Sequence, residues 1–223
     1  MTPIDKEDIN YRDEVVRKLI HLCSLSIPVI YYFIPQSIAI IILSILTTLA
    51  IVLDVSRHFF PAVGKLFYMI FGFLLRKHEK DGRKKNLNGA TYVFISALLG
   101  VIIFPKVLFL TAFPILIISD STAALIGRKY GRHKLFAKSL EGTLAFFISA
   151  SIVVLFTPKL MNGSITEYFI GILAAAIGAI VENISFGIAD DNLTIPISVG
   201  LSMWLFYILL FPGIQLILPN VPR

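Results

Sequence analysis

The chain has 223 residues, of which 57% are hydrophobic and 15% charged, and its formal net charge is +6. Soluble domains average about 45–50% apolar and roughly 25% charged residues, so this composition excludes an ordinary soluble domain and indicates an integral membrane protein. The basic residues flank apolar stretches and form no nucleic-acid recognition motif, so we expect no nucleic-acid partner. The single cysteine, Cys23, excludes an internal disulfide and a cysteine-based zinc site.

Apolar stretches with few or no charges dominate the chain after a polar start. Residues 1–18 are rich in charge and lack the pattern of a cleaved signal peptide, so we expect a cytoplasmic N-terminal segment there. A spanning helix needs about 20 mostly apolar residues. Bounded by proline-containing breaks, the expected spans are 19–35, 37–55, 90–105, 107–127, 143–157, 167–185 and 195–213.

One more apolar segment, 59–75, is short, contains Lys65 and includes Pro61 near its start. This pattern favours an interfacial or re-entrant helix over a spanning one. No repeat or flexible linker interrupts the chain. The sequence therefore predicts an all-α fold, a polytopic transmembrane bundle of about seven spans plus one interfacial helix, as a single membrane-embedded domain over 1–223.

Basic residues concentrate in the loops on one side of this expected bundle. Residues 76–85 include six basic and two acidic side chains, and residues 128–138 include five basic and no acidic ones. Because lysine and arginine excess marks the cytoplasmic side, we expect the N-terminus inside and the C-terminus outside. Two spans separate each of the polar segments 76–89, 128–142 and 182–194 from the next, so all three share one face whether or not 59–75 spans.

The first candidate residues in chain order lie between 76 and 91. Lys77, His78 and Glu79 could take part in catalysis, although the pattern favours a solvated interfacial loop for most of this segment. Asn88, followed by glycine at the start of a span, is either a site residue or a turn and helix cap.

Asp120 is the next candidate. A carboxylate within or near a spanning helix needs a partner or a water-filled cavity. Asp120, Ala123, Ala124 and Gly127 fall on one helical stripe. Small residues on that stripe either let a second helix pack closely, with Asp120 as a buried structural group, or leave room for a metal or phosphate bound by Asp120.

The loop 128–143 combines glycines with several cations. Arginine can grip a polyphosphate bidentately and lysine supplies a point charge, but a positive-inside loop has the same composition. Ser139 and Glu141 read as a helix N-terminus with an acidic first turn. Glu141 is either part of that cap or a carboxylate that holds Mg²⁺ or orients a lysine. The basic residues of the loop are Arg128, Lys129, Arg132, Lys134 and Lys138.

A third polar segment, 181–196, contains oxygen donors suited to a hard cation such as Mg²⁺. Glu182 precedes the adjacent pair Asp190 and Asp191, and Asn192 follows that pair. A divalent ion would relieve the repulsion between adjacent carboxylates. The alternative is a polar loop with an Asx turn before the next span.

The chain lacks the P-loop motif, the Gly-x-Ser-x-Gly motif, the protein-kinase signatures and the His-Glu-x-x-His motif. Yet acidic and basic segments on one face are what phosphoryl or nucleotidyl transfer requires, with Mg²⁺ on carboxylates and cations around a polyphosphate. Apolar spans beside such a site favour a lipid substrate.

Five segments of the chain carry a resemblance to a known family. D-S-T-A-A-L-I-G-R-K-Y-G-R-H-K (120–134), K-S-L-E-G-T (138–143) and D-D-N-L-T-I-P (190–196) resemble the membrane lipid-kinase branch of the cytidylyltransferase-like superfamily. That branch includes dolichol kinase, phytol kinase and fungal CTP-dependent diacylglycerol kinase. L-L-R-K-H-E (74–79) and L-N-G-A-T-Y (87–92) are similar to the fungal enzyme in particular. Ser119 stands where many relatives have glycine, which leaves the carboxylate that follows in place.

The resemblance implies transfer of the γ-phosphate of a nucleoside triphosphate, CTP by analogy, to a lipid alcohol at the cytoplasmic face, with Mg²⁺ as cofactor. Polyprenol or dolichol, a phytol-type alcohol and diacylglycerol all suit an apolar site beside membrane lipids, and a homo-oligomer is compatible with it. The resemblance implies one of two roles, binding Mg²⁺ or activating the lipid hydroxyl, for Asp120, Asp190 and Asp191. The implied triphosphate ligands are Arg128, Lys129, Lys134, Lys138 and Ser139, and Glu141 and Asn192 would complete the site.

Two alternative functions remain at this point. Phosphatidate cytidylyltransferase belongs to the same superfamily, but the chain lacks that enzyme's long C-terminal signature. An ion-coupled membrane transporter could use Asp120 in an ion pathway. Transporters often show internal repeats and midplane sites, whereas this chain shows no repeat and its acids lie near one face.

Overall fold

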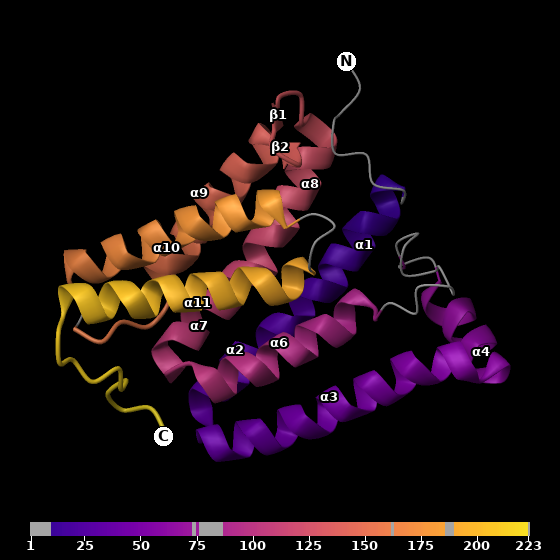
Figure 1. Ribbon diagram of the computed structural model, residues 1–223, viewed down its shortest axis with the longest axis horizontal. Helices are drawn as coiled ribbons and strands as arrows, with labels where there is room; N and C mark the ends of the chain where they lie inside the picture. The colour runs from indigo at the N-terminus through magenta and orange to yellow at the C-terminus, as the bar shows by residue number, and fades with distance from the viewer. Residues whose placement is uncertain (1–9, 73–74, 76–86, 162, 186–189, 223) are drawn as a thin grey trace.

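The structure is a computed structural model that describes residues 10–72, 75, 87–161, 163–185 and 190–222. It is nearly all-α, with one two-stranded antiparallel hairpin that the sequence analysis did not predict (Figure 1). The helices are α1 (Tyr11–Leu22), α2 (Ser26–Phe33), α3 (Gln36–Phe59), α4 (Pro61–Phe71), α6 (Gly89–Ile103), α7 (Lys106–Ile115), α8 (Ser121–Tyr130), α9 (Leu140–Phe156), α10 (Ile165–Ile184) and α11 (Asp191–Leu210). A 3₁₀ turn (Cys23–Leu25) joins α1 to α2, a π-helical turn (Leu116–Asp120) joins α7 to α8, and the strands are β1 (Lys134–Leu135) and β2 (Lys138–Ser139).

A helical segment lies over each of the seven predicted spans, but only five of the described helical segments are long and apolar enough to cross a membrane. These five are Tyr11–Phe33, Gln36–Phe59, Lys106–Tyr130, Ile165–Ile184 and Asp191–Leu210. The other two, α6 and α9, have 15 and 17 residues. At a rise of about 1.5 Å per residue they are shorter than a bilayer core of about 30 Å. The count of seven spans therefore stays a prediction.

The N-terminal part of the bundle differs from expectation. Helix α1 begins at Tyr11, so eight of the 18 residues of the segment 1–18 belong to this helix, and two of its charged side chains, Glu14 and Lys18, are buried. Within the apolar segment 59–75, α4 is a helix of 11 residues, about 16 Å long and too short to span. An interfacial position for α4 remains a prediction.

Helix α7 lies at the centre of the bundle. Eight of its ten residues are buried, and it packs against α2, α6, α9 and α11. Its sequence, K-V-L-F-L-T-A-F-P-I, has no polar face, which is the pattern of a helix surrounded by other helices. Helix α3 lies at the edge, beside α6 in Figure 1, and exposes a row of large apolar side chains.

The helix from Lys106 to Tyr130 changes geometry at its midpoint. Pro114 cannot donate a backbone hydrogen bond, and the π-helical turn begins two residues later and ends on Asp120. Such π turns are often found at functional sites. Asp120 thus lies inside this long helix, directly before α8.

The end of the bundle away from the hairpin is closed by charged side chains that bind backbone groups. Lys106 Nζ donates to the carbonyls of Ile34 (2.8 Å) and Pro222 (2.6 Å). Lys159 Nζ donates to two carbonyls at the end of α9, and Glu167 accepts from the amides of residues 160 and 161 at 2.7 and 2.8 Å. The hydroxyl of Tyr207 also donates to Glu167, at 2.8 Å. These contacts satisfy helix ends that would otherwise be unpaired.

Candidate active site

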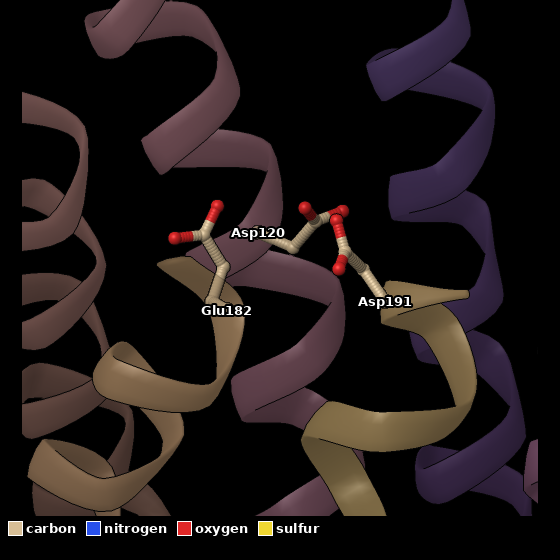
Figure 2. Close-up of side chains that lie close together, drawn as sticks. All are labelled: Asp120, Glu182 and Asp191. Atoms are coloured by element: carbon tan, nitrogen blue, oxygen red, sulfur yellow. The ribbon is translucent and has the colours of Figure 1, made fainter. Parts of the chain in front are cut away.

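Three carboxylates from three helices meet at the hairpin end of the bundle (Figure 2). One oxygen each from Asp120, Glu182 and Asp191 lies within 4.8 Å of the others. Asp120 ends the π-helical turn, Glu182 lies in the last turn of α10, and Asp191 is the first residue of α11. Asp120 and Glu182 are buried and Asp191 is partly buried. We call these three residues the carboxylate cluster.

Lys138 lies between two members of the cluster. Its Nζ is 2.7 Å from Glu182 Oε1 and 2.9 Å from Asp191 Oδ2. Burial alone would lower the pKa of Lys138, but the charges of Asp191, Glu182 and Asp120 outweigh it and raise that pKa above its ordinary value. The ammonium therefore stays charged at neutral pH.

The β hairpin positions Lys138. Leu135 pairs with Lys138 across the two strands, and Phe136 in the connection has a positive φ of 51°. The side-chain oxygen of Asn183 in α10 accepts from the amides of Ala137 (3.0 Å) and Lys138 (3.2 Å). The amide nitrogen of Asn183 in turn donates to Thr143 Oγ1 at 2.6 Å. This buried network ties the hairpin to α9 and α10.

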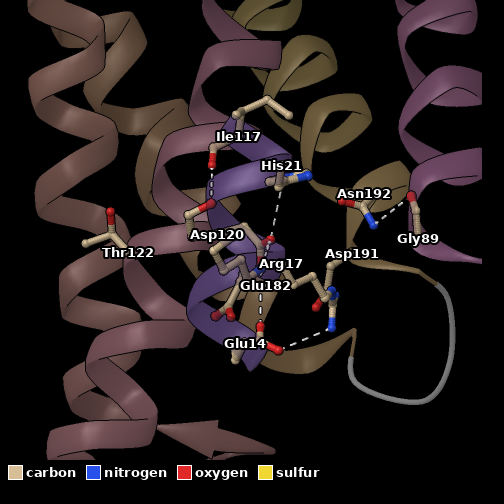
Figure 3. Close-up of polar contacts among 12 residues, drawn as sticks. Glu14, Arg17, His21, Gly89, Ile117, Asp120, Thr122, Glu182, Asp191 and Asn192 are labelled. Atoms are coloured by element: carbon tan, nitrogen blue, oxygen red, sulfur yellow. Dashed lines mark hydrogen bonds and ion pairs between the residues drawn. The ribbon is translucent and has the colours of Figure 1, made fainter. Parts of the chain in front are cut away.

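Helix α1 supplies further charges that the sequence analysis did not assign to the site (Figure 3). Lys18 Nζ is 2.5 Å from Asp120 Oδ2 and 4.0 Å from Glu14 Oε1. His21 Nε2 lies 3.9 Å from the same Asp120 oxygen, and Arg17 pairs with Glu14 at 3.4 Å. A signal was present, since positions 14, 18 and 21 fall on one helical face that runs into an apolar helix.

The predicted acidic pair at the start of α11 has two different roles. Asp191 joins the cluster and also accepts a short hydrogen bond from Ser185 Oγ. Asp190 caps α11, accepting from the amide nitrogen of Asn192 at 2.9 Å and from its side chain at 2.7 Å. The third place in the cluster is taken by Glu182 and not by Asp190.

Two more predicted site residues serve as helix caps. Ser139 caps α9 by accepting from the amide of Gly142 at 3.2 Å, and Asn88 caps α6 by accepting from the amide of Thr91 at 2.9 Å. Glu141 lies in the first turn of α9 and accepts from the amides of Arg132 and His133. It also pairs with the ring of His133 at 2.7 Å. Glu141 thus organises the loop before β1.

The remaining predicted phosphate ligands differ in how far their side chains are exposed to solvent. Arg128 is largely buried and lies 3.8 Å from Glu14 Oε2. Lys129 and Lys134 are exposed, and Lys129 lies over the ring of Tyr130. The segment with Lys77, His78 and Glu79 is outside the described residues.

The stripe of small residues on α8 packs against α9. A Cβ added at Gly142 would lie 3.2 Å from the carbonyl oxygen of Ala123 and 3.3 Å from the Cα of Gly127. This close approach is the packing role considered for the stripe. It leaves Asp120, at the start of the stripe, directed at α1, α10 and α11 (Figure 2).

A cavity of about 380 Å³ lies beside the cluster, between α1, α3, α4 and α6. Lys18, His21 and Asn192 line it. A second buried acid, Asp54 of α3, also faces it and was missed by the sequence analysis. Asp54 pairs with Arg57 Nε at 2.7 Å and accepts from Asn88 N and Thr91 Oγ1. The acid and the arginine are three residues apart at the end of an apolar helix, a pattern that marks a buried ion pair.

The carboxylate cluster fits a divalent cation. Buried carboxylates that converge repel one another, and Lys18 and Lys138 offset this repulsion only in part. Among the described residues, Glu182 Oε2 is buried and has no hydrogen-bond partner. A buried carboxylate oxygen without a partner is costly, and a hard cation with oxygen ligands would satisfy it.

Comparison with known proteins finds relatives of the chain in a bacterium, an archaeon and fungi. It is 35% identical over 208 residues to uncharacterized protein RP860 of Rickettsia prowazekii, covering 91% of this chain and 98% of that protein. It is 33% identical over 195 residues to uncharacterized protein MJ1137 of Methanocaldococcus jannaschii, covering 84% and 91%. A protein of Schizosaccharomyces pombe named CTP-dependent diacylglycerol kinase 1 is 28% identical over 156 residues, covering 65% and 70%. No family model matches, and no solved structure matches significantly.

Proposed function

We infer the function of this chain from its family and its site: the chain belongs to the same family as RP860 of Rickettsia prowazekii and MJ1137 of Methanocaldococcus jannaschii, and fungal CTP-dependent diacylglycerol kinases are its distant homologues. We propose that it transfers the γ-phosphate of CTP to the hydroxyl of a lipid alcohol at the cytoplasmic face of the membrane. The observation that carries this proposal is the carboxylate cluster, flanked by Lys18 and Lys138, beside a cavity with apolar walls.

Under this proposal the cluster holds the metal. Asp120, Glu182 and Asp191 would bind Mg²⁺, which, when bound, neutralises charge on the phosphate oxygens. The donors are all carboxylates, which suits a hard cation. Lys138 already bridges Glu182 and Asp191, so a bound ion would share these oxygens with its ammonium or release it towards the phosphates.

Cations around the cluster would hold the triphosphate. Lys138 and Lys18 are the nearest, and Arg17 and Arg128, both near Glu14, lie on the same side. Lys129 and Lys134 are exposed in the last turn of α8 and in β1, where they would meet the nucleotide from solvent. Arginine grips phosphate oxygens in pairs and lysine acts as a point charge.

The proposed reaction balances without any further reactant. The hydroxyl oxygen of the lipid forms a bond to the γ-phosphorus, and the bond from that phosphorus to the β,γ-bridging oxygen breaks. CDP leaves, and the hydroxyl proton passes to a carboxylate within hydrogen-bond reach. Asp120 is the best placed of the three for this role, because Lys18 and His21, which contact it, also line the cavity.

A double-label assay tests the proposal. Purified protein is incubated with CTP labelled at either the γ- or the α-phosphate, together with diacylglycerol, a polyprenol or phytol. A kinase places the γ label in the lipid and releases CDP. Incorporation of the α label with release of pyrophosphate would instead identify a cytidylyltransferase. If neither label enters any lipid under any condition, the proposal is wrong.

The same assay identifies the preferred nucleotide, by competition, and the preferred lipid. Unlabelled ATP should compete with labelled CTP far less well than unlabelled CTP does. Diacylglycerol is the first lipid to test because the fungal homologues carry its name. Equal competition by ATP would retain the kinase and remove the CTP preference.

A further inference from the structure

Two cavities adjoin along one side of the bundle. The first is the cavity of about 380 Å³ beside the carboxylate cluster, and the second, of about 320 Å³, lies between α2 and α3. Ser24 and Phe94 line both of them, so the two are neighbours. We call the two cavities together the chain groove.

One face of α3 runs the length of the chain groove. Leu53 and Ala50 line the first cavity, and Leu46, Leu43 and Ala39 line the second. Steps of three and four residues keep all five on the same side of the helix. Ala39 lies 15 positions before Asp54, a distance of about 22 Å at a rise of about 1.5 Å per residue.

The groove is polar at one end only. Asp54, Asn88, Thr91 and His21 lie at the end near the carboxylate cluster, while the second cavity is lined mainly by aliphatic and aromatic side chains. Leu46 and other lining residues of α3 are also partly exposed on the outer surface, so the groove is bordered by side chains that face lipid. This pattern matches a molecule with one polar head and a long apolar chain.

We propose that the chain groove binds one apolar chain of the lipid substrate, with the hydroxyl at the polar end beside the carboxylate cluster and the chain end near Ala39. This assignment rests on the proposed kinase function and adds to it the path of the chain. At carbon–carbon bonds of about 1.5 Å, each advancing an extended chain by roughly 1.3 Å, a length of about 22 Å accommodates about 17 carbons.

Selection by the groove is steric. A chain that moves from bilayer hydrocarbon into an apolar groove gains little from the hydrophobic effect, because both surroundings are apolar. A bulky side chain midway along the groove should therefore exclude long chains and leave short ones unaffected. Leu46 is the suitable position, since it lines the second cavity and is already 39% exposed, which limits damage to the core.

The test compares Leu46→Trp with Ile45→Trp, whose position is 56% exposed and lines neither cavity. Turnover is measured with dioctanoylglycerol and dipalmitoylglycerol. In Leu46→Trp, kcat/KM for dipalmitoylglycerol should fall by about tenfold, as overpacking of a filled site does, while the value for dioctanoylglycerol stays close to wild type. Ile45→Trp should leave both values near wild type. An equal response of both variants would overturn the chain groove while leaving the kinase intact.

A second readout does not depend on turnover. A palmitoyl diacylglycerol with a photoreactive group at the chain end is cross-linked to wild type and to Leu46→Trp in detergent. The label should appear in α2 and the first half of α3 of wild type and be lost in the variant. Labelling elsewhere, or equal labelling of both proteins, refutes the groove. Wild type that labels as expected but never phosphorylates lipid would refute the kinase and keep the groove.

Discussion

Two buried glutamates at opposite ends of α10 differ in how their charge is satisfied. Glu167 accepts from two backbone amides and the hydroxyl of Tyr207, so its carboxylate is fully enclosed by neutral donors. Glu182 faces Lys138 and two other carboxylates, and its own Oε2 is buried without a hydrogen-bond partner. Two glutamates on the same helix therefore differ: hydrogen bonds satisfy the carboxylate of Glu167, whereas Glu182 lies in a group of carboxylates whose charge is only partly compensated. A site for ligands is recognised by this incompleteness and not by burial alone.

The strongest way to break the comparison is to neutralise the cluster. Asp120→Asn and Asp191→Asn should each lower kcat/KM by about 100-fold or more, the typical cost of removing a group that stabilises developing charge. In Asp120→Asn, Lys18 still has Glu14 as an ion-pair partner at 4.0 Å, so the fold should survive. Activity is measured with γ-labelled CTP, and thermal unfolding in detergent reports the fold.

The control for these variants is Asp13→Asn, the same chemical change in the first turn of α1 and outside the carboxylate cluster. It should keep wild-type turnover. If both cluster variants remain active, the cluster is not the site of chemistry.

Metal binding sharpens the comparison without any need for turnover. Adding Mg²⁺ at about 100 times its Kd to EDTA-treated protein should stabilise the fold by about 2.7 kcal/mol, a shift of several degrees in Tm. Glu182→Gln should lose most of this shift, whereas Glu167→Gln should retain it. A shift of the same size in both variants would place the metal elsewhere.

For stability without metal the order of the two variants should be reversed, with Glu167→Gln the more damaging. Glu167→Gln leaves two part-buried amides and a buried tyrosine hydroxyl with one acceptor oxygen, so we expect it to lower stability by about 2 kcal/mol. Glu182→Gln relieves repulsion between carboxylates and, without Mg²⁺, should unfold at the wild-type temperature or above. Both are read from thermal unfolding in EDTA. Greater destabilisation by Glu182→Gln would reverse the roles assigned to the two ends.

The smallest expected effect is a pH dependence at the closed end. Burial lowers the pKa of Lys159, and the charge of Glu167 opposes this only in part. Between the lowered pKa of the folded state and about 10.4, Lys159 binds fewer protons in the folded protein than in the unfolded chain, so stability rises with pH over that interval. Lys159→Met should reduce this rise, measured as Tm from pH 7 to 10. Lys138, whose pKa is raised, should give no such rise in that range.

Much of the site could be predicted because helix counting depends only on apolar length and charge. That reasoning placed the segments of Asp120, Lys138 and Asp191 on one face, and the structure brings these side chains together. The contributions of Glu14 and Lys18 were missed because charges at the start of an apolar helix usually anchor it at the interface. Their role depends on a contact between positions 102 residues apart, which no local pattern encodes.

The fold was predicted less completely at three places. The β hairpin was missed because two strands of two residues each carry no periodic signal. The π-helical turn was missed because one proline predicts a break or kink but not the turn that follows it. The choice between Asp190 and Glu182 required knowing which way α10 and α11 face each other, and that is set by tertiary packing.

The pairing of Lys18 with Asp120 has a consequence for biosynthesis. Lys18 lies in α1, and its partner Asp120 is made 102 residues later. A charged side chain in a membrane-spanning helix is costly unless it has a partner, and Asp120 becomes available to Lys18 only once the helix from Lys106 to Tyr130 has been inserted. Glu182 and Asp191 follow later still. Until Asp120 is in place, Lys18 has only the acids of its own segment, such as Glu14, to offset its charge, and the fragment that ends before α11 lacks Asp191 and therefore has no complete carboxylate cluster.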